Sequence, residues 1–130
     1  PKGTNVFTKA GVAIGGRQFG RLSGFAPCPV DIATGDNYIL PDIPDIRIIH
    51  TPGHTLGSQC VIVNDEYALV GDTLFSMFPG RVYPPFADAE ELIKTCWQKL
   101  MQTNCHAFLP GHGKAIKRTF LQKRYNARYG

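Results

Sequence analysis

Three short segments of this sequence each place one strong metal ligand directly after an apolar run. The runs and their ligands are 46–50 with His54, 67–70 with Asp72, and 107–109 with His112. The end of a strand fixes the position of the residue that follows it, and the small residues around each ligand let its side chain face a common cleft. Two imidazoles and a carboxylate suit zinc, and also iron or manganese. A carboxylate has two oxygens, so Asp72 can bridge two cations, and a metal pair at ~3.5–4 Å can activate water.

The apolar runs have the patterns of β-strands. Segment 46–50 is rich in β-branched residues, and the runs 60–63 and 67–70 predict an antiparallel hairpin turned at 64–66. Because both runs of this hairpin are almost continuously apolar, we expect both faces of the sheet to be covered. The run 107–109 predicts a further short buried strand.

One helix is predicted over 88–103, and a second over about 115–124. Asp88 can cap the first, and Glu91 completes a capping box. Its apolar residues recur at helical spacing on one face, which predicts core packing. They are Leu92, Ile93, Cys96, Trp97, Leu100 and Met101. A hairpin of strands followed by helices indicates an α/β domain of the layered α+β kind.

Three segments of the sequence resemble motifs of the metallo-β-lactamase superfamily. Residues 48–58 (IIHTPGHTLGS) resemble its third metal-binding motif, residues 71–75 (GDTLF) its fourth, and residues 109–113 (LPGHG) its last. The amino acids in these motifs are most similar to those of the glyoxalase-II-like hydrolase branch. The resemblance covers about residues 30–118. It implies the C-terminal half of an αββα sandwich, with a mixed or antiparallel sheet and flanking helices.

The resemblance also implies a ligand set. His54 would bind the first metal, Asp72 would bridge both metals, and His112 would bind the second. The metal would be zinc, with iron or manganese as alternatives. The resemblance assigns no residue of this chain as catalytic.

Several neighbouring polar residues are expected to play supporting parts. Thr55, Ser58 and Thr73 would hydrogen-bond around the ligand loops. His50 matches a position that is not a ligand, and we expect it to be a hydrogen-bonded structural histidine. His106 is expected to be structural or exposed. The aromatic residues Tyr83 and Phe86 can line the cleft, although nothing ties them to a substrate.

The superfamily's main signature, His-x-His-x-Asp-His, is absent, since no histidine precedes His50. Two explanations stay open: a fragment of a longer protein, or a natural short protein that lost catalysis and kept the scaffold. In the first, the parent would be a di-metal hydrolase in which metal-bound hydroxide attacks an ester, thioester, amide or phosphoester bond of a small molecule. This chain alone would then be inactive, with weak or partial metal occupancy. In the second, it would be a non-catalytic dimeric interaction module.

The organisation along the chain predicts a single domain over residues 1–130. Residues 1–37 form a Gly-rich segment with weak strands, 38–113 the motif-bearing core, and 114–130 a basic C-terminal helix or tail. Half of a sandwich would leave an apolar sheet face exposed. Since monomers rarely leave large apolar patches open, we expect a homodimer that covers this face.

Composition narrows the function classes. Hydrophobic residues make up 43% of the chain and charged residues 18%, which is typical of a soluble globular protein. No apolar run approaches the ~20 residues needed to cross a bilayer. The tail 114–130 carries six bases and no acid, but a solvated helix face is the favoured interpretation and nucleic acid binding is not expected.

The four cysteines form no Cys-x-x-Cys pair, so a zinc knuckle or redox motif is not expected. Cys60 and Cys96 have the settings of small core residues, which favours a reducing, cytoplasmic location. A disulfide between Cys96 and Cys105 stays open on sequence alone.

Overall fold

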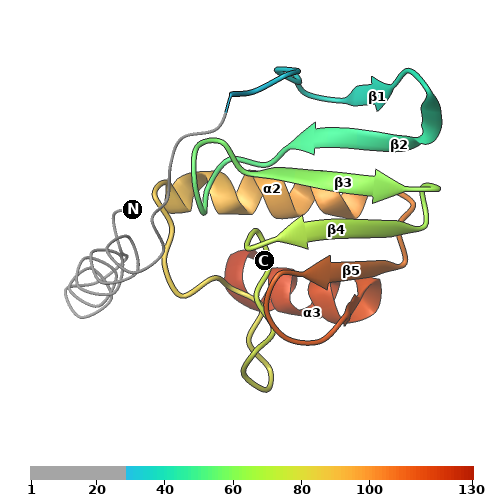
Figure 1. Ribbon diagram of the computed structural model, residues 1–130. Coiled ribbons are helices and arrows are strands. Elements are labelled where there is room, and N and C mark those ends of the chain that lie inside the picture. The colour runs from blue at the N-terminus through green and yellow to red at the C-terminus, as the bar shows by residue number, and fades with distance from the viewer. Residues whose placement is uncertain (1–28) are drawn as a thin grey trace.

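The computed structural model describes residues 29–130, and within them the chain forms one mixed sheet with two helices (Figure 1). The strands follow one another in space as they do in sequence. They are β1 (Tyr38–Leu40), β2 (Ile43–His50), β3 (Gln59–Val63), β4 (Tyr67–Gly71), β5 (Ala107–Pro110) and β6 (Ile116–Lys117). The helices are α2 (Glu90–Gln102) and α3 (Arg118–Tyr129). The weak strands predicted near residues 6–7 and 12–14 lie outside the described residues.

Strands β1 to β4 form an antiparallel meander, and β5 joins β4 in parallel because α2 lies between them in the chain. The predicted hairpin of β3 and β4 is confirmed. Asn64 and Asp65 in its turn have φ angles of 53° and 54°. This left-handed conformation suits a tight turn in which the Glu66 N–H donates to the Val63 carbonyl at 3.0 Å, and Asn and Asp tolerate it well.

The strands reach further toward the N-terminus than the predicted run 46–50, because residues 38–45 contain β1 and the first residues of β2. The register slips here, because Leu40 pairs with Ile43 while Ile39 pairs with Arg47. Pro44 falls inside this irregularity. The missing N–H of a proline therefore removes no regular ladder bond, and the strand tolerates it.

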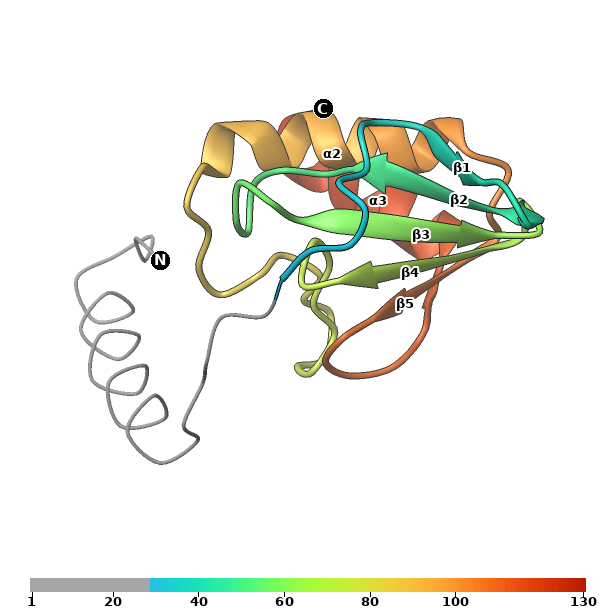
Figure 2. The ribbon, with the colours of Figure 1, turned by 45° about the horizontal axis from the view of Figure 1, so that its top comes forward.

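Both helices pack on the same face of the sheet (Figure 2). The core lies between them and the sheet, and its largest buried side chains include Trp97 of α2 and Phe108 of β5. The buried strand residues facing the helices are Ile49, Cys60, Ile62, Ala68, Val70 and Phe108. Trp97, Ile93 and Leu100 meet them, as the helical spacing of the apolar residues predicts.

The opposite face of the sheet is not covered by any helix in residues 29–130, so the expectation that both faces are covered is wrong for the described chain. Ile48, Val61, Leu69 and Leu109 are register partners across β2 to β5 and form an apolar row on this face. Leu69 is 45% exposed and Tyr67 is 40% exposed. Continuous apolar strands therefore identify an apolar face without showing what covers it.

Helix α2 begins at Glu90, and its N-cap residue Ala89 makes no side-chain capping bond, so the predicted Asp88 capping box is wrong. The backbone N–H groups of Asp88 and Ala89 instead donate to the carbonyls of His54 and Gly53, at 3.1 and 3.0 Å. A long-range contact thus fixes the start of this helix.

Helix α3 begins at Arg118, later than predicted, because residues 116–117 form β6. It then continues to Tyr129, beyond the predicted end at 124. Arg118 donates to the carbonyls of Met101, Thr103 and Cys105, in the last turn of α2 and just beyond it. The basic tail is therefore packed against the domain in part, and is not solely a solvated face.

The predicted α+β class with a mixed sheet is confirmed. Within residues 29–130, no helix is long and apolar enough to cross a bilayer. Cys60, Cys96 and Cys105 are buried free thiols, so the disulfide left open between Cys96 and Cys105 is absent.

Candidate metal centre

The three ligand loops meet because of strand direction. Strand β2 is antiparallel to β3, which is antiparallel to β4, so β2 and β4 run the same way. Strand β5 is parallel to β4. The C-terminal ends of β2, β4 and β5 therefore lie at one edge of the sheet, as their arrowheads show in Figure 1. His54, Asp72 and His112 all follow these ends.

The structure brings His54, Asp72 and His112 together around the carboxylate. The Nε2 atom of His54 lies 3.5 Å from Oδ2 of Asp72. The Nε2 atom of His112 lies 3.6 Å from the other oxygen, Oδ1. Each histidine thus faces its own carboxylate oxygen. Asp72 is the side chain that the two pairs share.

His54 is held by its side chain. Its Nδ1 lies 3.0 Å from the carbonyl oxygen of Phe86, and its ring centroid lies 4.9 Å from that of Phe86. A carbonyl can only accept, so Nδ1 carries the hydrogen of this bond. In the neutral imidazole, the lone pair is then on Nε2, which faces Asp72. The His54 side chain is only 14% exposed.

His112 is held mainly by its backbone. Its carbonyl accepts from the N–H of Ser76 at 3.0 Å, and Gly113 bridges to Ser76 beside it. Gly113 has a φ of 99°, and a Cβ there would collide with the carbonyl group of Ser76. The His112 side chain is 52% exposed, with its ring 5.4 Å from that of Phe75.

A buried polar network joins the loops of His54 and Asp72. The hydroxyls of Thr51 and Thr73 lie 3.2 Å apart, and the Thr51 hydroxyl also lies 3.2 Å from Sγ of Cys60. The indole N–H of Trp97 donates to the Thr73 carbonyl at 3.1 Å. Burial raises the pKa of the Cys60 thiol, which therefore stays neutral in this network. Sequence reasoning identified Thr73 but missed Thr51 and Trp97, because only the fold brings them together.

The residues flanking His54 shape its loop. The Ser58 hydroxyl accepts from the Thr55 N–H at 3.1 Å and lies 2.9 Å from the Thr55 hydroxyl. His50 has its Nε2 2.8 Å from the carbonyl of Leu56, as expected of a hydrogen-bonded structural histidine. His106 is exposed and packs edge-on against Tyr67, away from the ligand loops. Phe86 contacts His54, whereas Tyr83 lines a separate pocket.

Within residues 29–130, no three His, Cys, Asp or Glu side chains form one group that could hold an ion by themselves. The close distances nevertheless show two His–Asp pairs, each with a different carboxylate oxygen. Each His–Asp pair therefore supplies only two candidate ligands, which is too few to complete the coordination of a metal ion. The donor atoms fit metal binding in kind, since imidazole nitrogen and carboxylate oxygen are ordinary zinc and iron ligands.

Comparison with known sequences finds relatives to part of the chain, and no family model matches. An uncharacterised protein of Aquifex aeolicus is 36% identical over 81 residues, which cover 59% of this chain and 38% of the relative. The hydroxyacylglutathione hydrolase of Pelagibacter ubique is 41% identical over 56 residues, covering 42% of this chain and 23% of the enzyme. The chain thus matches well under half of the length of these curated relatives.

Solved structures match most of the described chain. A metallo-β-lactamase superfamily protein of Sulfolobus tokodaii gives a TM-score of 0.66 at 19% identity, and the match covers 93% of this chain and 49% of that protein. A metallo-β-lactamase family protein of Thermus thermophilus gives 0.61 at 17% identity, covering 92% and 46%. A protein solved in a di-iron-bound form gives 0.57 at 22% identity, covering 90% and 59%. The resemblance of this sequence to the metallo-β-lactamase superfamily is therefore confirmed at the level of the fold, and the chain has the fold of about half of each of these proteins.

Proposed function

We propose that this chain carries one side of a di-metal hydrolase site of the metallo-β-lactamase type. The observation that supports this most is the arrangement around Asp72, whose two oxygens face two different histidines at 3.5 and 3.6 Å. A neutral His54 with its hydrogen on Nδ1 presents a lone pair to a carboxylate, which is also an acceptor. Two facing acceptors need a cation between them, either a proton or a metal ion.

The metal ions would be held by His54 on one side, by His112 on the other, and by Asp72 on both. When bound, a pair of such ions activates a water molecule and stabilises developing negative charge. Other residues of this chain would hold the ligand side chains in position. The Phe86 carbonyl fixes the tautomer and ring of His54, as outer partners of metal ligands do, and the Thr51–Thr73 contact fixes the spacing between the His54 and Asp72 loops. The metal is proposed to be zinc, with iron as the main alternative.

The bond hydrolysed is proposed to be a thioester or a related ester in a small molecule. The support is the similarity to proteins described as hydroxyacylglutathione hydrolases. Because this chain holds only three of the ligands that such a site needs, the isolated chain should bind metal weakly and hydrolyse little. Full activity belongs to a longer protein or an assembly that supplies the other ligands.

Zinc binding to the 130-residue chain tests this proposal. Competition with a chromogenic chelator should give weak binding that Asp72→Asn abolishes, since that residue serves both pairs. His106→Ala is the matched control, because it removes an exposed imidazole outside the site and should leave the affinity unchanged. Equal affinity of the wild-type and Asp72→Asn chains would overturn the ligand assignment. Turnover of a thioester panel by the wild-type chain would instead contradict the claim that the isolated chain is nearly inactive.

A homodimer is a second proposal, supported by the open apolar face of the sheet. The row that includes Val61 and Leu69 is the kind of surface that monomers rarely expose, and a second copy would cover it. Light scattering should give a dimer at micromolar concentration, and Leu69→Lys should shift it toward the monomer. Phe120→Lys changes an exposed apolar residue on α3 and serves as the control. A monodisperse wild-type monomer would refute the dimer and would also remove the support for a non-catalytic dimeric module.

The buried free thiols Cys60, Cys96 and Cys105 suit a reducing compartment, and on that ground we propose a cytoplasmic setting.

A further inference from the structure

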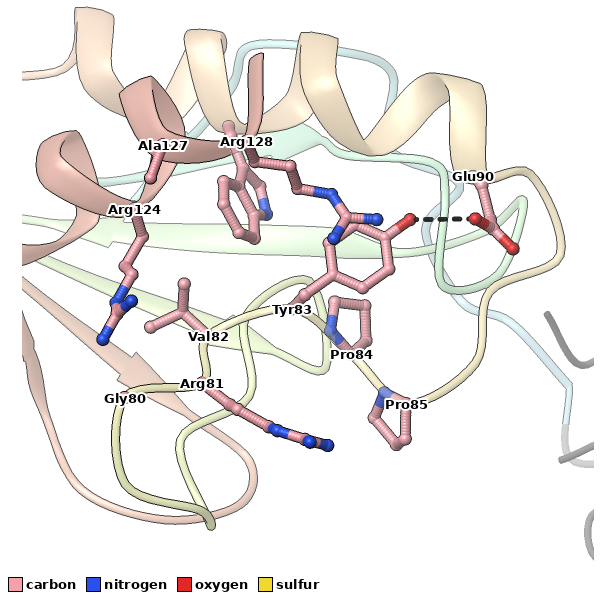
Figure 3. A pocket seen from close by; sticks show the side chains of 11 residues that line it. Gly80, Arg81, Val82, Tyr83, Pro84, Pro85, Glu90, Arg124, Ala127 and Arg128 are labelled. Carbon is pink, nitrogen blue, oxygen red and sulfur yellow. Dashed lines mark hydrogen bonds between the residues drawn. The ribbon is translucent and has the colours of Figure 1, made fainter. Parts of the chain in front are cut away.

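A cavity of about 510 Å³ lies between helix α3 and the loop that follows the Asp72 segment (Figure 3). The loop contributes residues 80–85, and α3 contributes Arg124, Ala127 and Arg128. Glu90 and Trp97 of α2 complete the lining. We call this cavity the arginine pocket, because Arg81, Arg124 and Arg128 all line it. None of the three proposed metal ligands lines it, so it is separate from the candidate metal centre.

Arg124 has a buried polar atom with no partner. Its Nε is the single buried side-chain nitrogen or oxygen within residues 29–130 that lacks a hydrogen bond. Burying an unpaired N–H costs free energy, so such groups in folded proteins usually mark a missing water, ion or ligand. Gly80 gives the guanidinium room, since a Cβ at Gly80 would stand 2.7 Å from Nη2 of Arg124.

Arg128 is held in place before any ligand arrives. Its guanidinium carbon lies 3.7 Å from the centre of the Tyr83 ring. The Tyr83 hydroxyl donates to Oε2 of Glu90 at 3.5 Å, as the dashed line in Figure 3 shows. Burial, followed by the charge of Glu90, raises the pKa of Tyr83 to about 12, so the phenol stays neutral and adds no negative charge. Stacking therefore reduces the freedom that Arg128 would lose on binding.

The charges that line the pocket do not balance. The lining contains three arginines and one carboxylate, that of Glu90, which already accepts from the hydroxyl of Tyr83. Arginine presents a planar fork of N–H donors that matches the oxygens of phosphate groups better than lysine does. A phosphate monoester carries close to two negative charges at neutral pH, which suits the surplus positive charge.

We propose that the arginine pocket binds a small molecule that carries more than one phosphate group, and that these groups accept from Arg124 and Arg128 of α3 and from Arg81 of the loop. The ligand would join α3 to the segment 80–85. That segment leads directly to Phe86, whose carbonyl holds His54. The proposal does not depend on the metal centre being functional.

Calorimetric titration of the full chain with pyrophosphate tests the proposal. The buffer contains EDTA, so that phosphate cannot bind through a metal ion. Saturable binding of one pyrophosphate per chain is expected, with inorganic phosphate binding more weakly. Arg128→Gln should lower the affinity roughly tenfold or more, because a charge-assisted pair is lost. Arg81→Gln should lower it as well, and this side chain is exposed on a loop, so the variant is expected to fold.

Lys123→Gln is the matched control. It removes the same charge from α3 but lies outside the pocket, so it should leave the affinity unchanged. Equal losses in Lys123→Gln and Arg128→Gln would overturn the site, since they would indicate binding to net charge. No saturable binding at millimolar pyrophosphate would also overturn it. Tighter binding of a single-stranded oligonucleotide, lost equally in all three variants, would overturn it in favour of a diffuse nucleic-acid surface.

Discussion

His54 and His112 face opposite oxygens of the same carboxylate, but the structure holds them in different ways. The ring of His54 is bonded through Nδ1 to Phe86, packs on the Phe86 ring and is 14% exposed. The ring of His112 is 52% exposed, and its loop is fixed by backbone bonds to Ser76 instead. One side therefore fixes the ligand atom itself, and the other fixes the chain that carries it.

This difference indicates how the two halves of the site are built. The direction of His54 is set by contacts within this chain, through Phe86 and through the Thr51–Thr73 pair beneath. The His112 ring is half exposed and contacts the ring of Phe75, so fewer contacts within residues 29–130 set its direction. Changes on the His54 side should act on the side chain, whereas changes on the His112 side should act through the backbone.

The largest effect is expected from Gly113→Ala on the His112 side. A Cβ at this position would collide with the carbonyl of Ser76, and the φ of 99° is strained for alanine. The substitution should lower the free energy of unfolding by about 2 kcal/mol or more. Urea denaturation measures it. Gly57→Ala in the His54 loop is the control, because nothing lies within 4 Å of its added Cβ. Equal stability of Gly113→Ala and Gly57→Ala would show that the Ser76 contact does not hold the loop.

A smaller effect is expected from Thr73→Val beneath the His54 side. The Thr51 hydroxyl would lose one of its two buried partners, while the Thr73 carbonyl would still accept from Trp97. Leaving a buried hydroxyl poorly satisfied costs about 1–3 kcal/mol. The free energy of unfolding measures the loss, and Thr119→Val on the exposed surface of α3 should cost much less. A neutral Thr73→Val would contradict the role of this network.

The main elements, and the meeting of His54, Asp72 and His112 at one edge of the sheet, were predictable because their signals are local. Apolar runs, a turn at residues 64–66 and helical spacing identify strands and helices without knowledge of partners, and each ligand stands directly after such a run. The predictions were wrong where a residue distant in the sequence determines the local structure. Pro44 lies within a strand because β1 and β2 slip register around it, and the backbone N–H of Asp88 is bonded to the His54 loop.

The supporting residues of the site were less predictable. Thr51, which directly follows β2, and Trp97 of α2 both contact the Asp72 loop, and nothing in their own sequence neighbourhood indicates it. The basic tail shows the same limit. Its charge pattern is typical of a solvated face, yet Arg118 binds carbonyls at the end of α2 and Arg124 has a buried Nε.

The two histidine supports can be compared directly through the proposed metal affinity. Phe86→Ala removes the ring that packs on His54 but keeps the carbonyl that accepts from Nδ1. An aromatic contact of this kind contributes about 0.5–1.5 kcal/mol, so zinc affinity should fall up to roughly tenfold. Phe75→Ala, beside the more exposed His112, should have a smaller effect. A chelator competition measures both, and a larger loss for Phe75→Ala would reverse the comparison.

The smallest effect is a pH dependence at the end of β2, where the chain enters the His54 loop. Asp36 accepts from Lys99 of α2 at 2.6 Å and from the His50 N–H at 2.9 Å, and these bonds hold the pKa of Asp36 below its usual 3.8. A lowered folded-state pKa contributes stability that is present above pH 3.8 and is lost as the pH falls through the folded value. The pair is exposed, so the contribution should be under about 1 kcal/mol. Urea denaturation at pH 6 and at pH 3 measures how much of the free energy of unfolding is lost in acid. This loss should be smaller in Asp36→Asn than in the wild type or in the exposed Asp42→Asn control. Equal losses in all three proteins would show that the Asp36 carboxylate does not anchor the strand that leads to His54.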